Sequence, residues 1–167
     1  MRIAFVVGSL SGGGAERVVS ELCSELAKRG NNVAVILVAS NSCTYEVDKR
    51  VKIIDCSQKA SIKGLGFINR VNKIRKSLLE FRAEVCVSFT VAVNLYSVLA
   101  CAFTKCKLIL AERNDPRYDP TSKISRIMRS LLYPFAHGYV FQTKGERDYF
   151  SKKIKKHSVI IPNPVNP

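Results

Sequence analysis

Residues 3–19 read IAFVVGSLSGGGAERVV, and this stretch decides the fold. Its first five residues form an apolar run that is shorter than a signal-peptide core and favours a buried strand. A glycine-rich turn follows, and then an apolar stripe with helical period continues to Leu26 before Gly30 supplies a helix stop. A strand, a glycine-rich turn and a helix in this order predict the first unit of a sheet whose strands are connected by helices.

Similar apolar runs recur along the chain, and their continuous apolarity is typical of strands that are covered on both faces of a parallel sheet. Seven strands are predicted, at residues 3–7, 33–38, 51–54, 85–88, 108–111, 138–141 and 158–161. Because the segments between them have helical period, we predict an α/β fold with a doubly wound, mostly parallel sheet and helices on both faces. One Rossmann-like domain is expected over residues 1–161, and the proline-rich residues 162–167 are expected to begin a linker to a second domain.

Two of the predicted helices, over residues 63–82 and 122–133, are amphipathic and basic. The apolar side chains expected to face the core are Phe67, Val71, Ile74, Leu78, Phe81, Ile124, Ile127, Met128 and Leu131. The basic side chains expected to face solvent are Lys63, Arg70, Lys73, Lys123, Arg126 and Arg129. A further helix is predicted over residues 91–103, and another from near Thr143, where Thr143 and Glu146 have the spacing of a capping box.

The net charge indicates an anionic partner. The chain has 27 Lys and Arg against 13 Asp and Glu, a formal charge of +14 and a pI near 9.8. Residues 49–82 hold ten of the basic residues and residues 123–156 hold nine, so the charge lies in two blocks. Nucleic acid, acidic lipid headgroups and phosphorylated small molecules are the partner classes that this charge leaves open.

The cysteines and the longest uncharged stretch favour a globular cytoplasmic protein. Six cysteines form no CxxC pair and have no nearby histidine, so we expect small buried side chains rather than a zinc site or a disulfide framework. Residues 85–104 carry no charge over the length of a bilayer span. Their β-branched start and the polar Thr90, Asn94 and Ser97 instead favour a strand, a turn and a core helix.

The glycine-rich turn is the strongest candidate site. Gly12, Gly13 and Gly14 let the backbone pass close to a ligand, and the helix start offers N–H groups to a phosphate or a sugar hydroxyl. Glu16 and Arg17 follow in the first helical turn. A P-loop is excluded because no lysine follows the last glycine, and NAD binding is disfavoured by the glycine spacing and by the lack of a carboxylate after the second strand. A tight turn without a ligand is the alternative.

A second candidate site is the polar run 112–117, directly after a predicted buried strand. Arg113 is suited to holding a phosphate or a carboxylate through two hydrogen bonds. Glu112 or Asp115 is suited to positioning a hydroxyl group or accepting a proton. A polar loop with an internal Glu–Arg pair is the alternative.

Polar side chains also follow two other predicted strands: Ser88, Asn94, Gln142 and Thr143. Because the carboxyl ends of parallel strands meet at one edge, these side chains and the glycine turn are expected to line one crevice. His137 and His157 lie at strand starts, so we expect both at the opposite edge, in structural roles.

Five motifs follow one another at strand ends in this order: Gly12-Gly13-Gly14-Ala15-Glu16-Arg17-Val18, Ser88-Phe89 with Asn94, Glu112-Arg113-Asn114-Asp115-Pro116, Phe141-Gln142-Thr143, and Ile161-Pro162-Asn163-Pro164-Val165. Together they resemble the N-terminal domain of family 4 glycosyltransferases of the GT-B fold. The resemblance covers the whole chain. It implies transfer of a sugar, with retention, from a nucleotide-sugar donor to an acceptor bound by this domain, in a cleft between two domains.

The resemblance also implies that a C-terminal domain, outside this chain, holds most of the donor, so the chain is expected to be inactive alone. The candidate catalytic residues are Glu112, Asn114 and Asp115. The candidate substrate-binding residues are Gly12, Gly13, Gly14, Glu16, Arg17, Ser88, Asn94, Arg113, Gln142 and Thr143. No cofactor and no metal ion are expected. Many members have a histidine where this chain has Glu112-Arg113-Asn114, which leaves the catalytic helper open.

Acceptors in this family are often lipid-linked, and a sugar or polysaccharide acceptor is expected here. The basic segments 63–82 and 123–129 suit docking on an anionic membrane surface, which predicts a cytoplasmic protein peripheral to the inner face of the membrane. Two alternatives remain, a basic nucleic-acid-binding module and a dinucleotide-dependent oxidoreductase. The first is disfavoured because few aromatic residues accompany the basic blocks, so no nucleic acid is expected as a partner.

Overall fold

The computed structural model describes residues 1–57 and 66–163. Within them, seven strands form one sheet in which every neighbouring pair is parallel. The strands are β1 (Arg2–Val7), β2 (Asn32–Leu37), β3 (Lys52–Asp55), β4 (Val85–Phe89), β5 (Lys107–Ala111), β6 (Gly138–Phe141) and β7 (Ser158–Ile160). The order β3-β2-β1-β4-β5-β6-β7 confirms the predicted doubly wound sheet and its seven strands.

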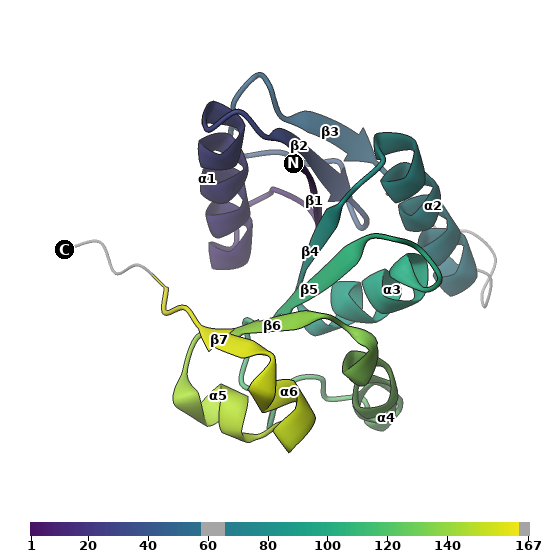
Figure 1. Cartoon of the computed structure of the whole chain (residues 1–167), viewed down its shortest axis with the longest axis vertical. Coiled ribbons are helices and arrows are strands. Elements are labelled where there is room, and N and C mark those ends of the chain that lie inside the picture. Colours follow the sequence, from purple (N-terminus) through teal and green to yellow (C-terminus); the bar gives the residue numbers. More distant parts are fainter. Residues whose placement is uncertain (58–65, 164–167) are drawn as a thin grey trace.

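The helices cover both faces of the sheet, as predicted (Figure 1). They are α1 (Gly14–Lys28), α2 (Gly66–Phe81), α3 (Val91–Cys101), α4 (Lys123–Leu132), the 3-10 turn η1 (Tyr133–Phe135), α5 (Lys144–Asp148) and α6 (Lys152–Lys156). α1 lies on one face, and α2 and α3 lie on the other. No helix in the described part of the chain combines the length and the apolarity needed to cross a bilayer, and the uncharged stretch 85–104 forms β4 and α3.

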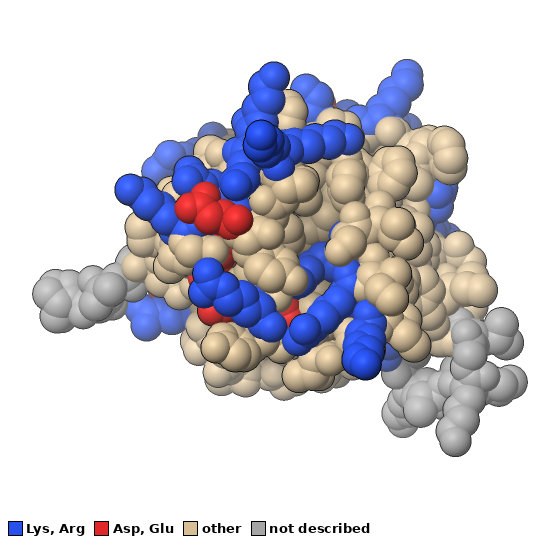
Figure 2. Space-filling model, turned by 90° about the horizontal axis from the view of Figure 1, so that it is seen from below, with Lys and Arg blue, Asp and Glu red and all other residues tan. Residues whose placement is uncertain are grey.

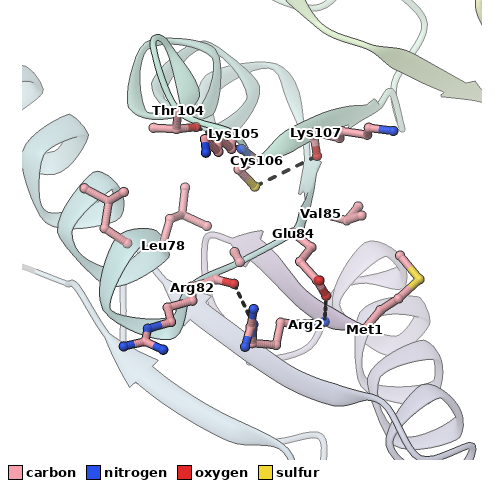
Figure 3. A pocket seen from close by; sticks show the side chains of 12 residues that line it. Met1, Arg2, Leu78, Arg82, Glu84, Val85, Thr104, Lys105, Cys106 and Lys107 are labelled. Atoms are coloured by element: carbon pink, nitrogen blue, oxygen red, sulfur yellow. Dashed lines mark hydrogen bonds between the residues drawn. The ribbon is translucent and has the colours of Figure 1, made fainter.

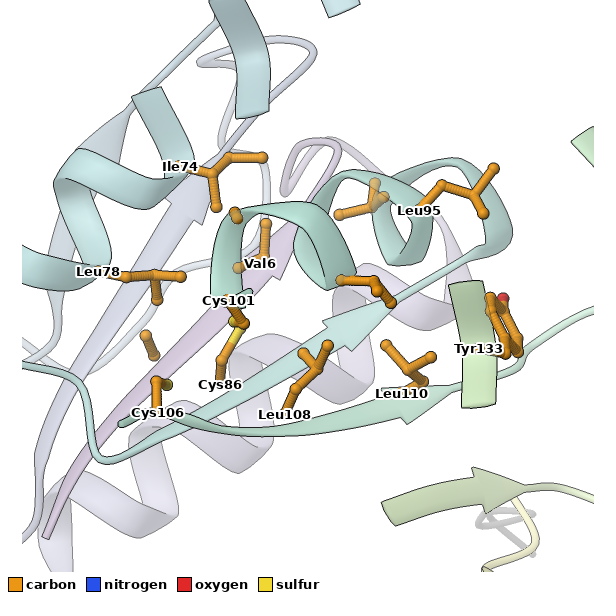
Figure 4. Close-up of a cluster of buried hydrophobic side chains, with 14 of the residues drawn as sticks. Val6, Ile74, Leu78, Cys86, Leu95, Cys101, Cys106, Leu108, Leu110 and Tyr133 are labelled. Carbon is orange, nitrogen blue, oxygen red and sulfur yellow. The ribbon is translucent and has the colours of Figure 1, made fainter. Parts of the chain in front are cut away.

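Two apolar cores lie on the two faces of the sheet. The larger one joins the sheet to α2, α3 and α4 and includes Val6, Ile74, Leu108 and Tyr133 (Figure 4). The smaller one lies under α1. All six cysteines are free, and five are buried, as expected; Cys43 is exposed.

The predicted orientation of α2 is confirmed on its buried side. Ile74 and Leu78 are buried against the sheet. Arg70 was expected to face solvent, but it is half-buried, donates to Tyr96 Oη at 3.3 Å and lies 5.8 Å from the centre of that ring. The hydroxyl and the π face of Tyr96 on α3 attract the guanidinium. Lys63 lies outside the described residues.

The predicted orientation of α4 is correct for three residues and wrong for four. Met128 packs against the core, and Lys123 and Arg126 are exposed, as expected. Ile124, Ile127 and Leu131 are exposed, and Arg129, which we expected in solvent, is only 2% exposed. Arg129 donates to the main-chain oxygens of Asp119, at 2.7 Å, and of Pro116, at 2.9 Å. The loop before α4 buries these carbonyls against the helix, and they need a donor, so the helix turns its arginine rather than its apolar stripe inward.

Candidate active site

Because all strands of the sheet run parallel, the loops after β1, β4, β5 and β6 leave the same edge of the sheet. The strand order reverses between β1 and β4, which is where sheets of this kind bind ligands. The glycine turn follows β1, and residues 112–115 follow β5, two strand spacings or about 10 Å away. The predicted common rim is therefore present. His137 lies at the opposite edge, where its Nδ1 accepts a hydrogen bond from Leu108 N at 3.2 Å.

The glycine turn is anchored on one side and open on the other. Leu10 is buried, and its backbone bonds to Ser42 and Thr44. Gly12 has a φ of +134°, a backbone conformation that side-chain-bearing residues rarely adopt. Gly13 caps α1 without a side-chain hydrogen bond, and within residues 1–57 and 66–163 no side chain accepts from the N–H groups of Gly14, Ala15 or Glu16. These groups are free donors for a ligand.

Glu16 and Arg17 point in different directions from this turn. The carboxylate of Glu16 lies against Gly13, so that a Cβ at Gly13 would collide with Glu16 Oε2. Arg17 instead pairs with Glu21, at 2.9 Å, on the exposed side of α1. Glu16 is therefore the side chain that faces the helix start, and it leaves this position only by changing rotamer.

The two residues predicted around the loop after β4, one at the end of β4 and one in α3, lie below the rim. Ser88 and Asn94 are fully buried. Between them, Thr90 has a φ of +70° and caps α3 without a side-chain hydrogen bond. A β-branched residue at positive φ stores backbone strain, and such strain concentrates at functional sites.

Glu112 is also buried, at 2% exposure, in a chain of polar side chains beneath the rim. Its Oε1 contacts the hydroxyl of Tyr133, which lies 3.0 Å from the Asn94 amide. The Asn94 amide has two possible orientations. In the first, its NH2 group donates to the Tyr133 hydroxyl. In the second, its oxygen accepts from the Tyr133 hydroxyl, and its NH2 group donates to Ser88 Oγ at 2.8 Å. In the second arrangement the carboxyl group carries the proton that it donates to Tyr133.

Burial raises the pKa of Glu112 to about 7, although Tyr133 and the charge of Arg129 oppose the rise. Its second oxygen, Oε2, has no hydrogen-bond partner among the described residues. A carboxyl group of this kind holds a proton near neutral pH. Glu112 is thus buried beneath the rim, where it contacts Tyr133 and, through Tyr133, is linked to Asn94.

Arg113 points the other way, into an apolar cavity of about 360 Å³ between α1, the sheet and residues 161–163, which follow β7. Its guanidinium lies 4.9 Å from the ring centre of Phe89, and its Nη1 donates to Asn163 Oδ1 at 2.9 Å. Gln142 Nε2 donates to the same oxygen at 3.0 Å. Burial lowers the pKa of Arg113, and Nε lacks a partner among the described residues. The cation thus retains unused donor capacity beside the rim.

Asn114 and Asp115 are exposed on the same loop. Asn114 donates to Asp119 at 3.0 Å, and Asp115 accepts from Arg117 N at 2.9 Å, so both side chains stabilise the loop. Thr143 accepts from Glu146 N at 3.1 Å, and Glu146 accepts from Gln142 N at 2.8 Å, which confirms a capping box shifted by one residue.

The predicted residues Glu112 and Arg113 thus lie on opposite faces of the sheet. Strand alternation could have shown this, because Leu108, Leu110 and Glu112 share one face while Ala111 and Arg113 share the other. No ion pair joins Glu112 to Arg113 within the described residues. The side chains of Tyr133 and Asn163 were missed as site residues, although Asn163 stands in one of the quoted motifs.

A larger cavity, of about 590 Å³, lies at the opposite, amino edge of the sheet, near Met1, Leu78 and Lys107 (Figure 3). Arg2 pairs there with Glu84 through its backbone N–H, at 2.6 Å, and with Arg82 O through Nε, at 2.8 Å. Ligands of parallel sheets bind at the carboxyl edge rather than at the amino edge, where this cavity lies. The carboxyl rim is therefore the candidate site.

Comparison with known proteins identifies relatives of this arrangement. A Campylobacter jejuni enzyme, GalNAc-alpha-(1->4)-GalNAc-alpha-(1->3)-diNAcBac-PP-undecaprenol alpha-1,4-N-acetyl-D-galactosaminyltransferase, is 27% identical over 165 residues, which cover 96% of this chain and 45% of the enzyme. The structure is similar to that of sucrose-phosphate synthase from Thermosynechococcus elongatus (TM-score 0.73, 13% identity, 96% of this chain and 47% of that one). It is also similar to Anabaena HepE in complex with UDP and glucose (TM-score 0.72, 14% identity, 98% and 45%).

The chain spans about half the length of the curated relatives it matches. These relatives favour neither the nucleic-acid-binding alternative nor the oxidoreductase alternative. The model of glycosyltransferase family 4 matches residues 12–167, from the glycine turn to the end of the sequence. The chain therefore belongs to glycosyltransferase family 4.

Proposed function

We propose that this chain forms the acceptor-side half of an enzyme that transfers a sugar, with retention, from a nucleotide-sugar donor to an acceptor. The observation that carries the proposal is the common rim, where the open glycine turn after β1 and the Arg113 loop after β5 flank the strained Thr90 turn after β4. Free N–H groups and a cation with spare donors suit phosphate and sugar hydroxyl groups. Family membership supports the same reaction class.

The rim residues take different parts in this reaction. Gly12, Gly13 and Gly14 present backbone donors to a phosphate or a hydroxyl group, and Glu16 moves aside when the ligand enters. Arg113, aligned by Phe89 and Asn163, holds an anionic group of the substrate. Asn114 and Asp115 meet acceptor hydroxyl groups at the exposed end of the loop. The remaining predicted residues support these groups from below or beside them: Arg17, Ser88, Asn94, Glu112, Gln142 and Thr143.

Donor and acceptor meet between two domains in this proposal. A C-terminal domain beyond the linker at residues 162–167 holds most of the nucleotide sugar, and residues 1–161 hold the acceptor. The Campylobacter relative carries an acceptor on PP-undecaprenol in its name, which supports a lipid-linked sugar or a growing polysaccharide here. The protein then works in the cytoplasm, peripherally attached to the inner face of the membrane. No metal ion or cofactor takes part.

The test is a transfer assay with a sugar linked through pyrophosphate to a short prenyl chain as acceptor and UDP-sugars as donors, with products detected by mass spectrometry. We expect product when this domain is joined to its donor-binding domain and none from this chain alone. Arg113→Ala lowers transfer by about ten- to a hundredfold, because a charged hydrogen bond is lost.

The matched control is Arg117→Ala on the same loop, since the Arg117 side chain is exposed and lies outside the cavity lining. Its transfer rate is expected to stay close to that of the unaltered protein. Equal rates for the two variants, or transfer by this chain alone, would contradict the proposal.

A further inference from the structure

One exposed stripe of α4 is apolar. Ile124 is 71% exposed, Ile127 60% and Leu131 65%, and their spacing of three and four residues places them on one stripe of the helix. In a typical surface helix this stripe faces the core, but here Arg129 takes that position. Three large aliphatic side chains are thus held in water by a helix whose orientation is fixed by buried hydrogen bonds.

Two phenylalanines outside α4 are exposed as well. Phe135, which follows in η1, is 73% exposed, and Phe103, after α3, is fully exposed. Both phenylalanines line an apolar cavity of about 390 Å³, together with Leu99 and Leu132. Isolated exposed apolar residues are common, but a contiguous set marks an interaction surface. We call the set Ile124, Ile127, Leu131, Phe135 and Phe103 the α4 surface.

Basic side chains flank this surface at both ends. Lys123 and Arg126 are exposed at the start of α4, and Lys105 and Lys107 are exposed after Phe103. Figure 2, which views the molecule from the side of α4 to α6, shows many Lys and Arg around uncharged surface and few Asp and Glu. An apolar strip with flanking cations matches a bilayer whose headgroups are anionic.

We propose that the α4 surface docks on an anionic membrane, with the apolar side chains at the boundary of the acyl chains and the lysines among the headgroups. A second copy of this chain is a poorer partner, because two molecules of net charge +14 repel each other. The proposal differs from the sequence-based expectation in that α2 takes no part: its outward residues are charged, and Ile68 and Leu79 stand apart on it.

Docking through the α4 surface brings the membrane close to the loop that holds Asn114 and Asp115. α4 starts directly after residues 112–122, so its first turn lies at the carboxyl rim of the sheet. Tyr118, in the loop before α4, is 75% exposed. A lipid-linked acceptor that rises from the bilayer beside α4 would therefore reach Asn114 and Asp115 first. This consequence rests on the proposed function, whereas membrane docking does not.

The experiment measures binding of the protein to vesicles of phosphatidylcholine, with and without phosphatidylglycerol, by co-sedimentation. The test variant is Ile124→Ser, Ile127→Ser and Leu131→Ser together. The matched control is Ile68→Ser with Leu79→Ser, since both residues are 55% exposed on α2. Circular dichroism and thermal melting confirm that each variant is folded, which we expect because all five side chains are exposed.

We expect the α4 variant to lose vesicle partitioning by on the order of a hundredfold and the α2 variant to keep it. Lys123→Glu with Lys105→Glu weakens binding to the anionic vesicles alone, and Lys73→Glu with Lys76→Glu on α2 changes it little. The proposal is overturned if the two serine variants bind the vesicles equally, or if the unaltered protein does not bind anionic vesicles. The proposal is also overturned if the serine substitutions on α4 change the oligomeric state in solution and leave vesicle binding unchanged, because the α4 surface would then join two copies of the chain.

Sugar transfer to a soluble short-chain acceptor, measured in parallel with each variant joined to its donor-binding domain, separates this proposal from the proposed function. A failure of membrane docking leaves that transfer intact. A failure of the proposed function abolishes transfer in every variant while vesicle binding persists.

Discussion

Replacing Glu112 by glutamine should change how the stability of the protein depends on pH. Glu112 is buried beneath the rim, accepts from Tyr133 through Oε1 and has no partner for Oε2 among the described residues. Burial holds its pKa at about 7, against an ordinary value of 4.5. Glutamine keeps the size and one acceptor oxygen but carries no proton that can dissociate.

The magnitude follows from the two pKa values. Between pH 4.5 and 7 the folded protein keeps a proton that the unfolded chain has already lost, so the free energy of unfolding falls as pH rises. At about 1.4 kcal/mol per pKa unit, the loss is of the order of 3 kcal/mol and is complete slightly above pH 7. The glutamine variant should lack this loss.

Urea denaturation followed by circular dichroism, at pH values from 5 to 8, measures the effect. We expect the variant and the unaltered protein to differ least near pH 5, with the variant gaining on the unaltered protein by up to about 3 kcal/mol toward pH 8. Parallel stability curves across this range would refute the reasoning, because they would mean that Glu112 ionises as easily in the folded protein as in the unfolded chain.

Three further stability predictions use the same denaturation assay. Arg129→Met should lower the free energy of unfolding by about 2 to 4 kcal/mol, because it leaves two main-chain carbonyls without their donor. The control Arg147→Met should lower it by less than about 0.5 kcal/mol. Similar losses in the two variants would argue against the role of Arg129. Gly12→Ala should destabilise by about 1 kcal/mol or more because of its φ of +134°, while Gly14→Ala, where a Cβ meets no atom, should be neutral or stabilising. Thr90→Gly should stabilise by roughly 1 kcal/mol through relief of the positive φ, and a loss of stability there would mean that the turn is unstrained.

The sheet could be predicted from the sequence because its signals are local. Continuous Val and Ile runs mark the strands, and the glycine turn fixes the first connection. The two edge strands β3 and β7 are nevertheless partly exposed, so apolar runs alone did not show which strands are covered on both faces. The orientation of α4 could not be predicted in this way. Ile124, Ile127 and Leu131 form the pattern of a buried stripe, but the helix turns to satisfy carbonyls of Pro116 and Asp119, and that demand arises only in the folded loop.

The sequence predicted which loops share one edge of the sheet, but it did not predict which side chains of those loops point toward that edge. Loops after parallel strands must share an edge, so the glycine turn and the 112–115 loop were correctly placed together. Which side chains enter the crevice depends on strand alternation continuing past the strand end, and this sends Glu112 into one core and Arg113 toward the other. Asn163 needed the tertiary fold, because its partners lie 50 and 21 residues away.

The carboxyl rim as the substrate site is tested most directly by NMR of the isotope-labelled protein, titrated with a soluble sugar pyrophosphate that carries a short prenyl chain. We expect the amide shifts that change on binding to cluster at Gly12–14, at residues 113–115 and at Gln142. Changes that cluster instead at the amino edge, around Arg2, Arg82 and Lys107, or no saturable change at all, would contradict the account.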